Sequence, residues 1–291
     1  MQITKKRSFS ARLYGFWLLS HPGPVSFHLL AITLFVLLAG WPHLVWPTLL
    51  LVIGAHTAMQ LAIAMLNDYC DQRLDAAGKP EKPIAQGLVT SRAALVAGCL
   101  MIVLMVLLLL PLPPLAWVLS LLYLTLGMAY NLGLKSTPLS GVVFALAMPL
   151  IPLYAFAGIG RSLPFLLWLV PVGFLLGVAL NLANSLPDVE EDAANGARTL
   201  AVVLGVKRAF LVCNSLLVLS TLLILLLDLT RILVIQSLVL IATLTLTGLL
   251  LATLLFFTRT GRAGATRKVY FYLVVLTCLV LAAGWFIGAL L

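Results

Sequence analysis

Nine long apolar stretches constrain this chain more than any other feature of its sequence. Each is about as long as a helix needs to cross roughly 30 Å of hydrocarbon. They lie near residues 24–40, 44–66, 93–111, 115–133, 140–159, 164–183, 209–227, 232–257 and 270–291. Only 9% of the residues are charged, against roughly a quarter in a soluble domain.

Backbone groups in lipid must be hydrogen-bonded within their own segment, so stretches this long and apolar are expected to be helices. We therefore expect an all-α polytopic membrane protein. Nine transmembrane helices would form a bundle around a central cavity with a polar cytoplasmic cap. Residues 1–291 would form a single domain, with residues 1–20 as a basic, amphipathic lead-in on the membrane surface.

The basic residues predict the orientation of the chain. A cytoplasmic N-terminus and nine spans place residues 67–92, 134–139, 184–208 and 258–269 on the cytoplasmic side. All 18 Lys and Arg residues except Arg161 and Arg231 then lie on that side, as the positive-inside rule requires. Membrane topology thus accounts for the net charge of +9 without a nucleic-acid partner. We expect an integral, multi-pass protein of the cell (plasma) membrane.

The acidic residues gather in two of the cytoplasmic segments, 67–92 and 184–208. Every Asp and Glu except Asp228 lies there, and the positive-inside rule does not explain this, because acidic residues contribute little to topology. Both segments contain the pattern N-x-x-x-D-x-x-x-D. The motif residues are Asn67, Asp71 and Asp75 in the first copy, and Asn184, Asp188 and Asp192 in the second.

The spacing of each motif predicts a stripe of oxygen ligands along one face of a helix. Residues four apart advance by only about 40° beyond a full turn, so the Asn and both Asp side chains share a face over about two turns. Four predicted spans separate the copies, which returns the second to the membrane side of the first, where the two can face each other.

Oxygen ligands of this kind suit Mg²⁺, which is commonly held by one or two carboxylates together with substrate phosphate oxygens. We therefore predict that the six motif residues hold Mg²⁺ and a diphosphate substrate. Basic side chains nearby would neutralise the remaining phosphate charge. The candidate substrate-binding residues around the motifs are Asp68, Arg73, Lys79, Lys82 and Arg198.

These segments resemble the UbiA superfamily of intramembrane prenyltransferases. The resemblance rests on NDYCDQRLD followed by KPEKPIAQG, on PDVEEDAANGARTLAVVLG, and on AYNLGLKSTPLSG after the fourth span. It implies nine transmembrane helices around two Asp-rich motifs. It also implies that the Asn and Asp residues of both motifs bind Mg²⁺ and an allylic diphosphate as catalytic residues.

The same resemblance implies that Tyr130 and Lys135 assist at the diphosphate, although their spacing is one residue longer than the commonest pattern. Many members carry an Arg-Pro pair near the first span, where this chain has His21-Pro22, so the resemblance supplies no N-terminal cationic contact. The four histidines share no ligand spacing and are expected to pack or to lie at the membrane interface. Gly173 and Gly177 are spaced to let two helices approach closely.

The function that follows from the resemblance is ionisation of an isoprenyl diphosphate and transfer of the prenyl group to an aromatic, quinone-precursor or lipid acceptor. The expected partners are the isoprenyl diphosphate, a hydrophobic acceptor and membrane lipid, and Mg²⁺ is the expected cofactor. One alternative is a terpene cyclase of the same superfamily that uses the same diphosphate site. Another is a cation transporter, but transport sites usually lie near the bilayer centre, where no acidic residue is expected.

Overall fold

The computed structural model describes residues 8–161, 164–260 and 264–290. Residues 1–7 of the predicted lead-in and Leu291 of the last predicted span lie outside these ranges. The described residues form helices without any strand. Nine of these helices are long and apolar enough to cross a membrane, so the prediction of an all-α polytopic membrane protein with nine spanning helices is confirmed.

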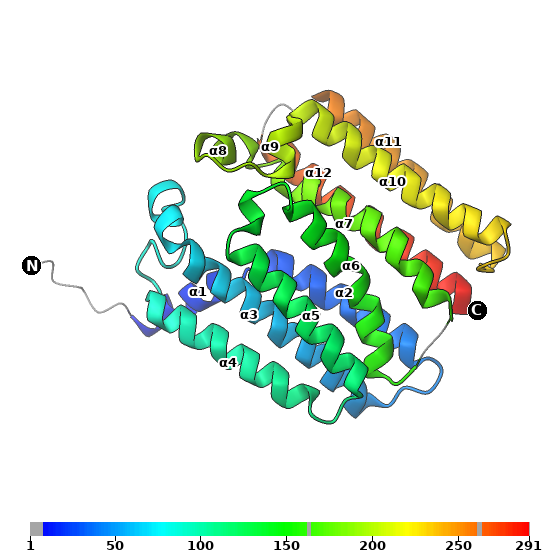
Figure 1. The fold of residues 1–291 in the computed structure, drawn as a ribbon, viewed down its shortest axis with the longest axis horizontal. Helices are drawn as coiled ribbons and strands as arrows, with labels where there is room; N and C mark the ends of the chain where they lie inside the picture. Colours follow the sequence, from blue (N-terminus) through cyan, green and yellow to red (C-terminus); the bar gives the residue numbers. More distant parts are fainter. Residues whose placement is uncertain (1–7, 162–163, 261–263, 291) are drawn as a thin grey trace, which may run out of the picture. The chain divides into compact units, whose positions relative to one another are not determined.

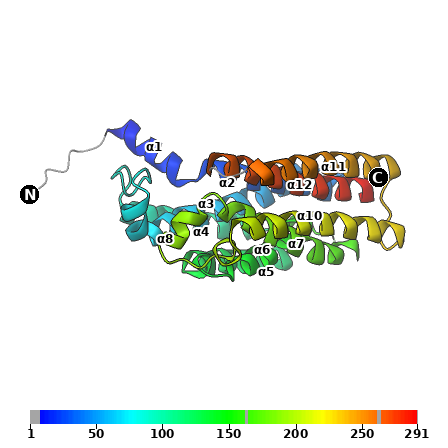
Figure 2. The same cartoon turned by 90° about the horizontal axis from the view of Figure 1, so that it is seen from above.

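The chain forms two compact units. Unit 1 comprises residues 1–132 and 154–160, and unit 2 comprises residues 133–153 and 161–291. In Figures 1 and 2 the long helices within each unit run roughly along one another.

Unit 1 is built around one long helix. Its helices are α1 (Phe9–Leu19), α2 (Pro22–Gly40), α3 (Trp46–Gly78), α4 (Ser91–Leu109) and α5 (Pro114–Asn131), and it takes in the last residues of α6 (Ser140–Gly158). The other helices of the unit pack on α3, chiefly α4, α2 and α5. With 33 residues, α3 is about 50 Å long, which is more than the hydrocarbon core requires.

The first helix, α1, is too short to span a membrane. In Figure 2 it lies at an angle to α2, from which residues 20 and 21 separate it. Its exposed side chains include Phe9, Leu13 and Trp17, which recur every four residues and so share one face. An exposed apolar face of this kind fits the predicted position on a membrane surface.

Unit 2 contains the first part of α6 and all the later helices. These are α7 (Leu169–Ser185), α8 (Val189–Ala194), α9 (Leu200–Leu204), α10 (Val206–Leu229), α11 (Ser237–Thr260) and α12 (Gly264–Leu290), with short 3₁₀ turns η1 (Leu134–Ser136) and η2 (Pro164–Trp168). Helix α7 packs on α10 and α12, and α11 packs on α12.

Glycines allow α6 and α7 to meet at very short range. A Cβ atom built on Gly177 would collide with the carbonyl oxygen of Phe144 and would lie 2.7 Å from the Cα atom of Ala145. A Cβ atom on Gly173 would lie 3.0 Å from the Cβ atom of Pro149. The predicted role of the two glycines in close helix packing is confirmed.

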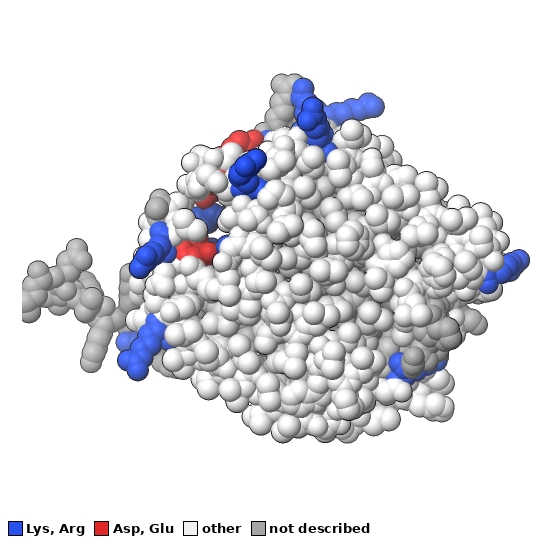
Figure 3. Space-filling view, viewed as in Figure 1, with Lys and Arg blue, Asp and Glu red and all other residues white. Residues whose placement is uncertain are grey.

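The surface of the helices matches a lipid environment. Large apolar side chains such as Leu100, Leu107, Leu219 and Leu249 are exposed on the flanks of α4, α10 and α11. On the face drawn in Figure 3 these flanks carry almost no charge, and the charged side chains gather toward helix ends. The charges therefore occupy the parts of the helices that leave the hydrocarbon region.

Candidate diphosphate and metal site

The first motif lies on the last turns of α3. Asn67, Asp71 and Asp75 all fall within one continuous helix, which runs on to Gly78. The predicted stripe is therefore present here, and the helix continues past the predicted end of the span at residue 66 as far as Gly78. Carboxylates at a helix C-terminus face the negative end of the helix dipole. A bound cation would offset this repulsion.

Asn67 is held by α5. Its Nδ2 atom donates to Oδ1 of Asn131 at 3.0 Å, and Nδ2 of Asn131 donates to the backbone carbonyl of Ile63 at 2.9 Å. Asn131 is buried, with 4% of its surface exposed. The Asn67 side chain is thus fixed by a partner 64 residues away, which no pattern in the sequence indicated.

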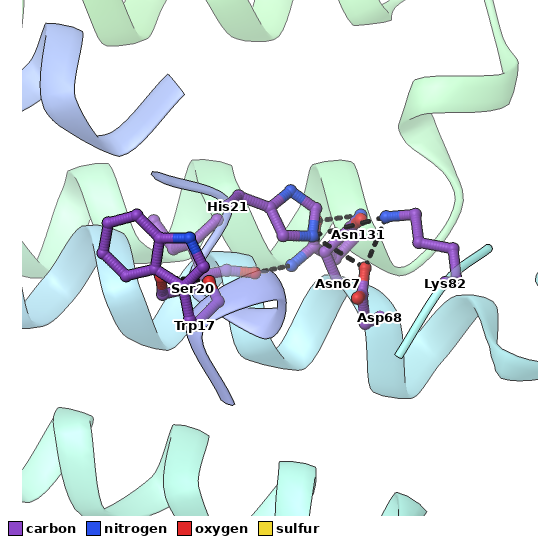
Figure 4. A network of polar contacts seen from close by, with 8 residues as sticks. Trp17, Ser20, His21, Asn67, Asp68, Lys82 and Asn131 are labelled. Carbon is purple, nitrogen blue, oxygen red and sulfur yellow. Dashed lines mark hydrogen bonds and ion pairs between the residues drawn. The ribbon is translucent and has the colours of Figure 1, made fainter. Parts of the chain in front are cut away.

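The neighbouring Asp68 is the centre of a charged network (Figure 4). Its side chain is 1% exposed, and its Oδ1 atom lies 2.8 Å from His21 Nε2 and 2.7 Å from Lys82 Nζ. The other oxygen, Oδ2, is buried without a hydrogen-bond partner in the described part of the chain. A buried carboxylate is costly unless it is paired, so the Lys82 ammonium group compensates its charge, and His21 Nε2 lies within hydrogen-bonding distance of the same oxygen.

The sequence did not indicate the two contacts that Asp68 makes here. His21 was expected to pack or to lie at the membrane interface, but it contacts the carboxylate next to Asn67. It has a left-handed backbone with φ of 48°, because α1 ends and α2 begins on either side of it. Lys82, which the sequence predicts to bind the diphosphate, donates one hydrogen bond to Asp68. The departure from an Arg-Pro pair at residues 21 and 22 was the signal that marked this position.

The second motif is divided between two helices. Asn184 lies near the end of α7, Asp188 precedes α8, and Asp192 lies within α8. The expectation of one continuous helical stripe is wrong for this copy. Pro187 has no N–H group to donate to the carbonyl of Ala183, and its ring crowds that carbonyl, so the helix ends before it.

Arg267 joins the two sides of this break. From α12, its Nη1 atom donates to the carbonyl of Leu186 at 3.2 Å and to Oε2 of Glu190 at 2.6 Å, and its Nη2 atom donates to Oε1 of Glu190 at 2.9 Å. Such a two-point contact fixes geometry as well as charge. Arg267 is only 5% exposed. The sequence marked it only as one of many cytoplasmic cations.

The contact with Arg267 lowers the pKa of Glu190 below its ordinary value, chiefly through the side-chain hydrogen bonds. Because the pKa is lower in the folded state, ionised Glu190 stabilises the fold at pH values above its unfolded-state pKa, about 4.3. This stabilisation is lost as the pH falls through the folded-state pKa. We therefore expect the melting temperature of the wild type to exceed that of Glu190→Gln at pH 7, and the gap to close on acidification. Thermal unfolding in detergent, from pH 7 to below the unfolded-state pKa, measures this difference in melting temperature. A difference that does not change with pH would contradict the prediction.

The remaining predicted substrate-binding residues lie partly in unit 1 and partly in unit 2. Unit 1 also holds Arg73, Lys79 and Tyr130, and unit 2 also holds Lys135 and Arg198. Within unit 2, the backbone N–H of Arg198 donates to the carbonyl of Ser136 at 2.8 Å. This bond brings the turn that carries Lys135 beside the segment that follows the second motif.

The donor atoms suit a divalent cation that also takes oxygen ligands from its substrate. Among the described residues, no three His, Cys, Asp or Glu side chains form a ready-made metal cluster. Carboxylates and carboxamides are hard oxygen donors of the type that Mg²⁺ accepts, and Mg²⁺ commonly takes only one or two carboxylates with phosphate oxygens and water. The motif residues therefore fit Mg²⁺ bound together with a diphosphate.

The fold and the two amide and carboxylate motifs define a class of helical membrane protein, and comparison with known proteins identifies its family. Residues 25–276 match the UbiA prenyltransferase family. The chain therefore belongs to the UbiA prenyltransferase family.

Named relatives include digeranylgeranylglyceryl phosphate synthases. That of Natronomonas pharaonis is 33% identical over 53% of this chain and 56% of the relative, and that of Methanoregula boonei is 31% identical over 68% and 71%. The 4-hydroxybenzoate octaprenyltransferase of Neisseria meningitidis is 31% identical over 50% and 51%. The chain thus matches about half the length of most of these relatives.

Solved structures share the fold. A digeranylgeranylglyceryl phosphate synthase structure has a TM-score of 0.71 at 16% identity, over 96% of this chain and 99% of that chain. A UbiA homologue from Archaeoglobus fulgidus bound to GPP and Mg²⁺ has a TM-score of 0.69 at 16% identity, over 93% and 98%.

Proposed function

We propose that this protein is a Mg²⁺-dependent membrane prenyltransferase. It would ionise an isoprenyl diphosphate and transfer the prenyl group to an aromatic, quinone-precursor or lipid acceptor. The observation that carries the proposal is the pair of N-x-x-x-D-x-x-x-D motifs in a chain of the UbiA prenyltransferase family. The fold neighbour with bound GPP and Mg²⁺ supports the choice of ligands.

In this proposal the six motif residues hold the metal: Asn67, Asp71, Asp75, Asn184, Asp188 and Asp192. When bound, Mg²⁺ would neutralise the diphosphate and make it a better leaving group. Cleavage of the C–O bond leaves the electron pair on the diphosphate and gives an allylic cation. The acceptor then forms a new bond to the cation and loses a proton.

Basic and hydroxyl side chains around the motifs would complete the binding of the diphosphate. The candidates are Arg73, Lys79, Tyr130, Lys135 and Arg198. Lys82 and Asp68 contribute differently, because they are bonded to each other. We propose that this pair, with His21, holds the segment after α3 in place next to Asn67.

We further propose that residues 1–291 act as a single domain in which both motifs serve one diphosphate. Both would lie on the cytoplasmic side of the plasma membrane and form the polar cap of a central cavity that holds the isoprenoid tail. The distribution of Lys and Arg supports this orientation. Among the proposed acceptors, the names of the relatives, digeranylgeranylglyceryl phosphate synthase and 4-hydroxybenzoate octaprenyltransferase, support a lipid or an aromatic compound.

The test is consumption of GPP by the purified full chain in lipid nanodiscs, with Mg²⁺ or with EDTA, and with or without 4-hydroxybenzoate or a phosphoglyceryl lipid. We expect diphosphate release only with Mg²⁺ and a prenylated product only with an acceptor. Hydrocarbon products formed without an acceptor would indicate a cyclase instead. Mg²⁺ flux into proteoliposomes without consumption of GPP would indicate transport.

A further inference from the structure

Helices α3 and α5 pack in register along a single line of contacts in unit 1. His56 of α3 lies against Tyr123 of α5, with ring centroids 5.6 Å apart. Further along, a Cβ atom on Gly127 would lie 2.5 Å from Cδ1 of Ile63, so the helices meet closely at this point. One helical turn beyond Ile63 and Gly127 stand Asn67 and Asn131, because residues four apart share a face.

The hydrogen bonds at this last contact determine which atom of each carboxamide is oxygen. A backbone carbonyl can only accept, so the Asn131 atom on the Ile63 carbonyl must be Nδ2. The other end of the Asn131 amide is then Oδ1, which can only accept. The Asn67 atom that meets it must be Nδ2. Both assignments follow from the fixed role of the Ile63 carbonyl, not from a choice between amide rotamers.

The Oδ1 atom of Asn67 therefore stands at the other end of the amide from the contact with Asn131. This oxygen is the only atom of the Asn67 side chain that a cation would accept as a ligand, because the amide nitrogen has no lone pair to offer. If Asn67 rotated its amide by half a turn, it would present N–H groups to the cation, and two oxygens would meet at Asn131.

We propose that Asn131 is a positioning residue that orients the Asn67 carboxamide as an oxygen ligand for the divalent cation. This role of Asn131 rests on the proposed metal-diphosphate function and adds to that function a residue outside both motifs. Partners of metal ligands in other proteins act in this way, and their substitution typically lowers metal affinity or activity by about 10–100-fold. Asn131 touches neither metal nor substrate in this role.

The test is Mn²⁺ binding to the purified full chain, measured by equilibrium dialysis in the presence of inorganic diphosphate. In Asn131→Leu the Asn67 amide is free to rotate, so the Mn²⁺ concentration for half-saturation should rise about tenfold or more. Asn131→Asp keeps an oxygen that accepts from Asn67 but repels the Ile63 carbonyl. It should lower the melting temperature while half-saturation stays at or below the wild-type value.

A double-mutant cycle with Asn67→Asp separates orientation from packing. A carboxylate presents oxygen on both sides, so its rotation no longer matters, and one of its oxygens would repel Oδ1 of Asn131. In this background Asn131→Leu should leave Mn²⁺ half-saturation unchanged or improve it. Asn214→Leu is the matched control, because Asn214 is also a buried asparagine with a side-chain partner, Tyr270. It should lower stability without changing Mn²⁺ binding.

Asn131 is not a positioning residue if folded Asn131→Leu binds Mn²⁺ like the wild type. The same conclusion holds if Asn131→Leu weakens binding equally in both backgrounds, since that result indicates packing alone. A wild type that binds no Mn²⁺ with diphosphate would overturn the metal site itself, and with it the role of Asn131.

Discussion

Replacing Asp71 or Asp188 by alanine is expected to lower prenyl transfer by about 10²–10³-fold, the loss typical of removing one group that stabilises developing charge. Asp71 lies on the last turns of α3, and Asp188 lies between α7 and α8. If both carboxylates serve one metal-diphosphate group, each loss leaves the leaving group poorly neutralised. Release of diphosphate from GPP at saturating Mg²⁺ measures the effect.

The double variant distinguishes one shared site from two separate sites. Residues that act as a unit are strongly non-additive, so Asp71→Ala/Asp188→Ala should be little worse than either single variant. Glu81→Ala is the matched control, because Glu81 is an exposed acidic residue of the first segment outside the motif. Full turnover in either Asp variant, or an equal loss in Glu81→Ala, would refute the assignment of the two aspartates.

Gly177→Ala is expected to destabilise the protein by about 2–3 kcal/mol, at the upper end of the range for overpacked cores. The added methyl group would collide with the backbone of Phe144 and Ala145 on α6. A backbone cannot swing away as a side chain can, so α6 and α7 would have to separate. The apparent melting temperature of the purified protein measures the effect.

Gly248→Ala provides the comparison for this prediction. Gly248 lies inside α11, and a Cβ atom added to it meets nothing within 4 Å. Alanine is preferred over glycine within a helix by roughly 0.5–1 kcal/mol, so this variant should be as stable as the wild type or slightly more stable. Equal melting temperatures for Gly177→Ala and Gly248→Ala would contradict the packing argument.

Local sequence patterns predicted most of the helices, and they predicted the helical conformation of the first motif but not of the second. Lipid requires continuous apolar helices, so each span is visible in a window of contiguous residues. The first motif also needed only helical periodicity, and α3 continues through it as expected. For the second motif the same periodicity failed, although Pro187 stands inside the pattern and is a recognised helix breaker.

The residues that surround the motifs could not be predicted in this way, since their partners are distant in the sequence. His21 meets Asp68 across 47 residues, Asn131 meets Asn67 across 64, and Arg267 meets Glu190 across 77. Each contact requires two segments that are distant in the sequence to pack in one register. No window of sequence contains that information.

The sequence by itself indicated that the protein lies in lipid, how many helices span the membrane and which residues are proposed to hold the metal, because these inferences depend on composition and on helical spacing. Only the tertiary structure decided how the polar side chains are held. Once helices are packed, each buried polar atom must find a partner within reach or bear a desolvation cost. Those partners fix the Asn67 amide, pair Lys82 with Asp68 and bridge the break at Pro187.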